Sequence, residues 1–202
     1  MAEIVSAGVH RPRNVDWKRA AALLYGDWGT SKAYVIGLAF VAAGFASLPI
    51  ILAATAAGLF ISTLWAMGLG QSAVALVLGV FAGFWLSYAF LLLGLFHNWF
   101  GITVADAKAT QELFLTAWIV IITMLTVATL RLALAFTAVL ALVDVALILV
   151  LIGTIQVSAN LLKAGGSVAF LFAAVGIYIF FGTASIATGG KPFPLGKPIL
   201  RA

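Results

Sequence analysis

The chain has 202 residues, of which 64% are hydrophobic and only 8% are charged, and it contains no cysteine. Soluble domains carry about 25% charged residues, so this composition excludes an ordinary soluble domain and favours a protein surrounded by lipid. The absence of cysteine excludes disulfides and thiolate metal sites.

The net charge of +5 is distributed around the apolar part of the chain. Basic residues flanking hydrophobic segments are the usual topology signal of a membrane protein, so we expect a lipid bilayer as the partner and no nucleic acid. The residues concerned are Arg11, Arg13, Lys18, Arg19 and Lys32 before the first long apolar run, and Lys191, Lys197 and Arg201 after the last.

Residues 1–30 lack the short apolar core and cleavage site of a secretory signal, and we expect them to form a cytoplasmic N-terminal tail. Within it, Asn14 can cap a helix that has Asp16 in its first turn. Apolar residues follow at helical spacing, namely Trp17, Ala21, Leu24 and Trp28. The pattern predicts an interfacial helix lying on the lipid headgroups, with a mobile tail as the alternative.

A helix needs about 20 apolar residues to cross a bilayer. The hydrophobic segments predict six such spans, at residues 32–48, 49–67, 72–95, 110–130, 132–155 and 163–186. The predicted fold is an all-α membrane protein, with six transmembrane helices in a bundle over residues 31–188 and a short N-terminal interfacial amphipathic helix. Residues 189–202 are predicted to form a cytoplasmic C-terminal tail.

The breaks between the spans differ in character. Pro49 suits the first turn of a helix, polar residues at 97–111 indicate a loop, and Arg131 leaves room for only a tight turn. With six spans, both terminal clusters and Arg131 lie on one side, whereas Lys108 and Lys163 lie on the other. The positive-inside rule then predicts a multi-pass inner-membrane protein with both termini in the cytoplasm.

Small residues such as Gly79 and Gly83 form a GxxxG pair in the third span. Helices in lipid associate through close backbone approach at such residues. The pair is equally compatible with packing inside one chain and with an oligomer interface.

Few polar residues lie within the spans. Asp144 stands deep in the fifth, where a carboxylate is expensive and usually faces the bundle interior or a wet cavity. It is either a proton-linked residue of a permeation path or a neutral acid that is hydrogen-bonded between helices. Thr116, Thr123 and Thr126 share one face of the fourth span and could line a pore, or bond to their own preceding carbonyls. Tyr88 is similarly ambiguous.

No pair of histidines has metal-ligand spacing, and the chain has only six carboxylates. A site for general acid and base catalysis needs two suitably placed groups, and a metal site needs several ligands. We therefore expect neither an enzyme nor a bound metal or other cofactor.

The stretch Gly83-Phe84-Trp85-Leu86-Ser87-Tyr88 resembles the acetate uptake transporter (succinate–acetate permease) family. Further short patterns follow in that family's order, namely Trp99-Phe100-Gly101-Ile102, Thr129-Leu130-Arg131, Ala135-Phe136, Asp144, Ile152-Gly153, Lys163-Ala164-Gly165-Gly166, Tyr178 and Pro194-Leu195-Gly196. The first third departs from the family, because Ser31-Lys32-Ala33-Tyr34-Val35-Ile36-Gly37 stands where members have Asn-Pro-Ala-Pro-Leu-Gly-Leu.

The resemblance implies a homohexamer whose protomers each contain a narrow path for small monocarboxylates. It also implies a hydrophobic constriction at Phe40, Phe81 and Val143, where Phe81 replaces a tyrosine of the family. The candidates for lining this path or for proton linkage are Asp144, Thr123, Thr126, Tyr88 and Tyr178.

The function predicted from these features is a channel or proton-linked transporter for small monocarboxylates such as acetate. The alternative is a membrane scaffold or accessory subunit that retains the fold without transport. The departure in the first third and the additional N-terminal helix motivate that alternative.

Overall fold

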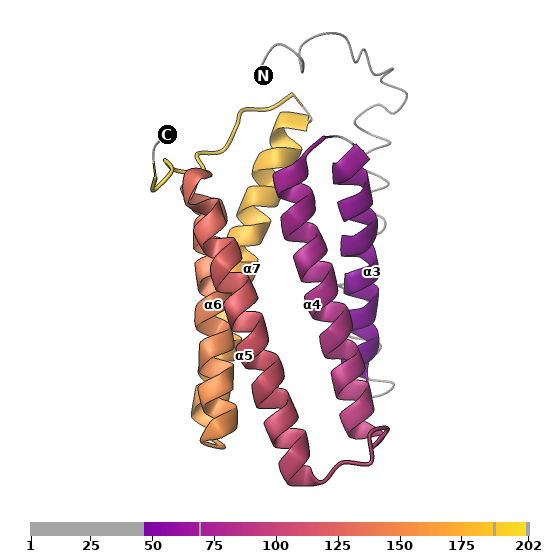
Figure 1. Cartoon of the computed structure of the whole chain (residues 1–202). Helices are drawn as coiled ribbons and strands as arrows, with labels where there is room; N and C mark the ends of the chain where they lie inside the picture. Colours follow the sequence, from indigo (N-terminus) through magenta and orange to yellow (C-terminus); the bar gives the residue numbers. More distant parts are fainter. Residues whose placement is uncertain (1–46, 69, 188, 201–202) are drawn as a thin grey trace. The chain divides into compact units, whose positions relative to one another are not determined.

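The computed structural model describes residues 47–68, 70–187 and 189–200. In this part of the chain all regular structure is helical (Figure 1). The elements are α3 (Ser47–Gly68), α4 (Ser72–Phe96), α5 (Val104–Ala128), the 3-10 turn η2 (Thr129–Arg131), α6 (Leu134–Ile155) and α7 (Ala159–Ala187). The predicted interfacial helix, Phe40 and residues 32–46 of the first predicted span lie outside the described residues.

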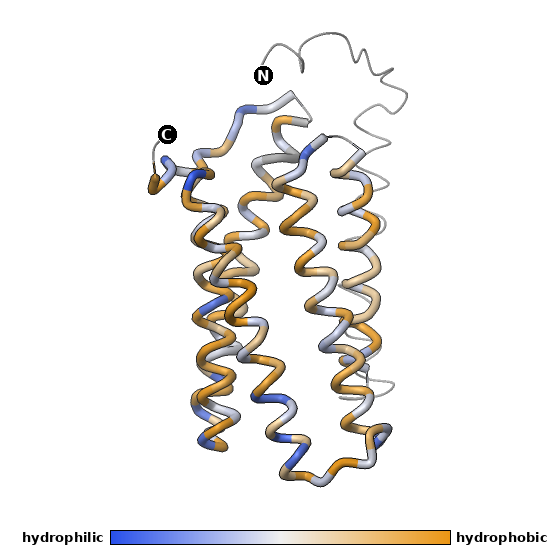
Figure 2. The backbone as a smooth tube through the Cα atoms, viewed as in Figure 1, coloured by the Kyte–Doolittle hydropathy of each residue, from blue (hydrophilic) through white to orange (hydrophobic). Residues whose placement is uncertain are grey.

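The described residues contain five helices that are long and apolar enough to cross a bilayer. Figure 2 shows hydrophobic residues along most of their length. Large apolar side chains also point away from the protein: Trp65, Met124 and Phe170 are 71%, 70% and 81% exposed. Since such surfaces are costly in water, the chain is a multi-pass membrane protein with lipid around these helices.

The helix α5 begins at Val104, so the predicted loop over 97–111 is wrong for residues 104–111. Thr103 is the N-cap: its hydroxyl accepts a hydrogen bond from the Asp106 backbone N–H at 3.2 Å and donates one to the Asp106 carboxylate at 2.6 Å. The first bond pairs a backbone N–H that has no partner within the helix, because it lies in the first turn. Local capping therefore extends the helix through a segment whose polarity indicated a loop.

The helix α7 begins at Ala159, four residues before the predicted start, and it includes Gly165 and Gly166. At Gly165, an added Cβ would lie 2.8 Å from Cγ2 of Val150 and 3.3 Å from the carbonyl oxygen of Ala146. Gly165 thus permits close approach of α7 to α6, as expected for helices in lipid.

Three helix pairs carry most of the packing: α3 with α4, α5 with α6, and α6 with α7. Two buried clusters occupy the interior. The first joins α4, α5 and α6 through Phe84, Leu115, Ile122, Val143 and Leu147, and the second joins α3 and α4 through Leu52, Ala89 and Leu92. In lipid, close van der Waals packing of this kind holds helices together.

The C-terminal segment 189–200 folds back onto the helix ends. The Leu195 carbonyl accepts a hydrogen bond from the Ala135 N–H at 2.9 Å, which satisfies a free N–H of the first turn of α6. The Leu200 N–H donates to the Leu130 carbonyl at 3.0 Å. These bonds bring the basic C-terminal segment to the same end of the bundle as Arg131.

Candidate functional site

A cavity of about 160 Å³ lies among α4, α5, α6 and α7. Its wall is almost entirely apolar, with two glycines on α7. The lining residues are Phe81, Phe84, Trp85, Tyr88, Leu115, Val143, Ala146, Leu147, Val150, Gly165, Gly166, Ala169 and Phe172. Two of the residues singled out as a constriction, Phe81 and Val143, therefore lie on the wall of one cavity, on α4 and α6.

Tyr88 contributes the one hydroxyl of this wall. Its ring stacks on Phe114 of α5 with a centroid separation of 5.5 Å. The side chain of Gln111, also on α5, interacts with the Tyr88 hydroxyl. Tyr88 thus gives an apolar cavity one polar contact, anchored from the neighbouring helix.

Asp144 lies beside this cavity, on the side of α6 that faces α5. Its Oδ1 accepts a hydrogen bond from Thr123 at 3.1 Å, and its Oδ2 lies 2.7 Å from the Thr126 hydroxyl. The Thr126 hydroxyl also lies 2.9 Å from the Ile122 carbonyl. The structure therefore gathers three of the predicted polar residues into one cluster, next to the cavity residue Val143. Thr116 instead donates to the Glu112 carbonyl of its own helix.

Tyr178 lies against the C-terminal segment. Its hydroxyl donates to the Pro194 carbonyl at 2.9 Å, and its ring contacts Phe193 at a centroid separation of 5.4 Å. Tyr178 thus joins α7 to the C-terminal segment and is separate from both the Asp144 cluster and the set of cavity-lining residues.

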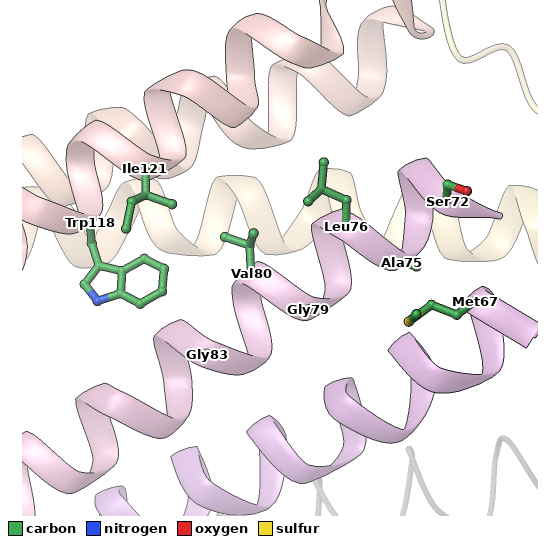
Figure 3. A pocket seen from close by; sticks show the side chains of 9 residues that line it. All are labelled: Met67, Ser72, Ala75, Leu76, Gly79, Val80, Gly83, Trp118 and Ile121. Atoms are coloured by element: carbon green, nitrogen blue, oxygen red, sulfur yellow. The ribbon is translucent and has the colours of Figure 1, made fainter.

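A second hollow was not predicted from the sequence. It is a wide groove of about 710 Å³ among α3, α4 and α5. Figure 3 shows Trp118 and Ile121 extending from α5 toward α4 across it. The groove is lined by Met67, Ser72, Ala75, Leu76, Gly79, Val80, Gly83, Trp118 and Ile121.

The two glycines of the GxxxG pair have different surroundings. A Cβ on Gly79 would lie 3.3 Å from Cγ2 of Thr63, so Gly79 permits close contact between α3 and α4 within the chain. A Cβ on Gly83 would lie 3.7 Å from Cη2 of Trp118. Gly83 therefore leaves room for about one methyl group between α4 and the Trp118 indole.

Aromatic side chains separate the groove from the cavity. Phe84 is at the centre of the group: it contacts Trp118 edge to face at a centroid separation of 5.1 Å, and Trp85 at 4.8 Å. The signal in the sequence is a pair of aromatic residues four positions apart on each of two spans, Phe84 with Tyr88 and Phe114 with Trp118. That spacing places both rings of a pair on one helix face.

Comparison with known proteins supplies one match. The family model described as the GPR1/FUN34/yaaH family matches residues 30–194, which include the cavity, the groove and the Asp144 cluster. Neither the curated proteins nor the solved structures contain a significant match to this chain.

Proposed function

Because the chain belongs to the GPR1/FUN34/yaaH family of acetate transporters, we propose that it is a channel or proton-linked transporter for small monocarboxylates such as acetate, with one path per protomer. The family is associated with transport and not with catalysis. The observation that carries the proposal is the apolar cavity that Phe81 and Val143 both line.

The cavity suits a small and largely apolar solute. A volume of about 160 Å³ corresponds to roughly five water molecules at about 30 Å³ each. Transfer of an isolated carboxylate into an apolar medium is very costly, whereas a neutral carboxyl group with one hydrogen-bond partner is tolerated. We infer that acetic acid crosses the cavity in its neutral form, with Tyr88 as its hydrogen-bond partner.

The hydrogen-bond geometry around Asp144 supports proton linkage. A threonine hydroxyl has a single proton to donate, yet Thr126 lies within bonding distance of both the Ile122 carbonyl and Asp144 Oδ2. A proton on Oδ2 satisfies both contacts, because Asp144 then donates to Thr126 while Thr126 donates to Ile122. With an ionised carboxylate, Thr126 must either share its one proton between the two oxygens or release the carbonyl, so one proton changes the hydrogen bonding of the cluster.

The basic residues support an orientation. Arg131 and the C-terminal residues Lys191 and Lys197 lie at one end of the described helices, with Lys108 and Lys163 at the other. The positive-inside rule assigns the first end to the cytoplasm. We propose an inner-membrane location with both termini cytoplasmic. From the family resemblance, we also propose a homohexamer with a path in each subunit.

The test is uptake of labelled acetate by proteoliposomes containing the purified protein, between acidic and neutral external pH. We expect uptake above that of empty vesicles, increasing as the pH falls and the neutral acid becomes more abundant. Absence of uptake at every pH would contradict the proposal. A stoichiometric partner protein in native membranes would then favour a scaffold.

A further inference from the structure

The groove and the cavity meet at one pair of rings. Trp118 lines the groove, Phe84 lines the cavity, and their centroids are 5.1 Å apart with the ring planes at 81°. Leu115, one turn before Trp118 on α5, lines the cavity. The wall between the two hollows is thus one side-chain layer thick at this point.

The two sides of Trp118 are packed differently. Toward the cavity the indole rests on Phe84, and along α5 it contacts Phe114 at a centroid separation of 6.2 Å. On the groove side, the neighbouring residue of α4 is Gly83, which has no side chain to hold the indole. Edge-on and tilted aromatic contacts are individually weak, and the groove beyond is wide.

We propose that Trp118 is a gate between the groove and the cavity, and that the groove is the vestibule through which a small neutral solute reaches the cavity. The groove also borders Met67 and Ser72, at the turn between α3 and α4, so it extends toward one end of these helices. In the closed state the indole rests on Phe84, and in the open state it moves past Gly83 into the groove. The gate deepens the proposed function, because it controls access to the same cavity.

The proposed gate predicts opposite effects for two substitutions. Trp118→Ala removes the indole and opens the wall. Gly83→Ala places a methyl group 3.7 Å from Cη2 of Trp118, which is ordinary van der Waals contact, and obstructs the movement of the indole past this position. The second variant is compatible with the packing of the closed state and is expected to fold.

Because the chain has no cysteine, one introduced thiol reports access without background. Ala146→Cys places the thiol on the cavity wall and Ala75→Cys places it in the groove. The probe is methyl methanethiosulfonate, a small neutral reagent, added to the full-length protein in liposomes. Modification rates are followed by intact mass, and Met124→Ala, which removes an exposed side chain of α5, is the matched control.

We expect Trp118→Ala to accelerate modification of the Ala146→Cys thiol about tenfold, as loss of two aromatic contacts allows. The Ala75→Cys thiol should react at an unchanged rate, and Met124→Ala should alter neither rate. Gly83→Ala should slow modification of the Ala146→Cys thiol. Equal rates with and without the Trp118 indole would overturn the gate, as would parallel acceleration of both thiols, which indicates general loosening.

If Trp118→Ala does not fold, the Gly83→Ala arm decides alone, and an unchanged or faster rate there overturns the proposal. The assay needs no acetate. If wild-type liposomes take up no acetate but the thiol rates follow the expected pattern, the gate is supported and only the assignment of acetate as substrate is rejected. Acetate uptake with thiol rates insensitive to Trp118 would reject the gate alone.

Discussion

Val143 and Asp144 are adjacent on α6, yet they face two different environments. Val143 is buried in the apolar wall of the cavity, and Asp144 faces the hydroxyls of Thr123 and Thr126 on α5. Successive side chains on a helix point about 100° apart. Val143 therefore faces the cavity while Asp144 faces α5. The Asp144 cluster therefore lies at the contact between α5 and α6, beside the apolar cavity.

The largest effect is expected from adding a second carboxyl one position away from Asp144. Val143→Asp places a carboxylate on the cavity wall without the threonine partners, and a charged residue at the centre of a membrane helix costs about 3 kcal/mol on insertion scales. We expect greatly reduced folded yield and loss of acetate uptake. Size-exclusion profiles and thermal unfolding in detergent measure the first effect.

Val143→Thr is the matched control, since it conserves the shape of valine and its hydroxyl can bond a preceding backbone carbonyl. It should fold and retain uptake. Equal damage from both substitutions would show that position 143 is sensitive to packing and not to charge.

Removing the native carboxyl should affect transport more than stability. Asp144→Leu leaves Thr126 bonded to the Ile122 carbonyl. Thr123 loses its bond to Asp144, but it is exposed and can donate to a preceding backbone carbonyl instead. We expect a change below about 1 kcal/mol in unfolding free energy and an uptake rate about tenfold lower at acidic pH. Proteoliposome assays across pH measure the rate.

Asp144→Asn sharpens this result, because the amide keeps the hydrogen bonds and cannot titrate. It should fold like the wild type and show the same loss of uptake as Asp144→Leu. Full uptake in the asparagine variant would assign Asp144 to helix pairing alone.

The neighbouring glycines of α7 test the wall of the cavity by packing. Gly165→Ala forces Cβ to within 2.8 Å of Val150 Cγ2, and overpacking typically costs about 1–3 kcal/mol. Gly166→Ala meets nothing within 4 Å and should not destabilise the fold. Thermal unfolding of the two variants should therefore differ, and equal unfolding temperatures would contradict the close approach of α6 and α7.

Hydrophobic length predicts the helices α3 to α7 well, because the bilayer sets the number of apolar residues that each span requires. The starts of α5 and α7 were predicted too late. At α5 the cause is Thr103, whose cap allows Asp106 and Lys108 to be helical. Polar residues near the end of a membrane helix indicate that the segment lies in water and not in lipid. They do not indicate whether the segment is helix or loop.

The site was predictable in part. The spacing of Thr123 and Thr126 placed them on one helix face, and the depth of Asp144 indicated a polar partner, but which helices meet is set by packing over the whole unit. The family resemblance named Phe81 and Val143, which line one cavity. The groove and the contact between Phe84 and Trp118 depend on side-chain directions that periodicity alone does not give.

The smallest expected effect concerns the hydroxyl that the cavity lacks at position 81. Phe81→Tyr restores the family's tyrosine on a wall where Tyr88 supplies the one hydroxyl, and a hydrogen bond to a neutral solute contributes about 1 kcal/mol. Half-saturation for acetate should therefore fall about fivefold, with little change in stability. Phe90→Tyr, on an exposed face of the same helix, should leave it unchanged. Equal effects at the two positions would mean that added polarity, rather than a hydroxyl facing the cavity, governs the affinity for the solute.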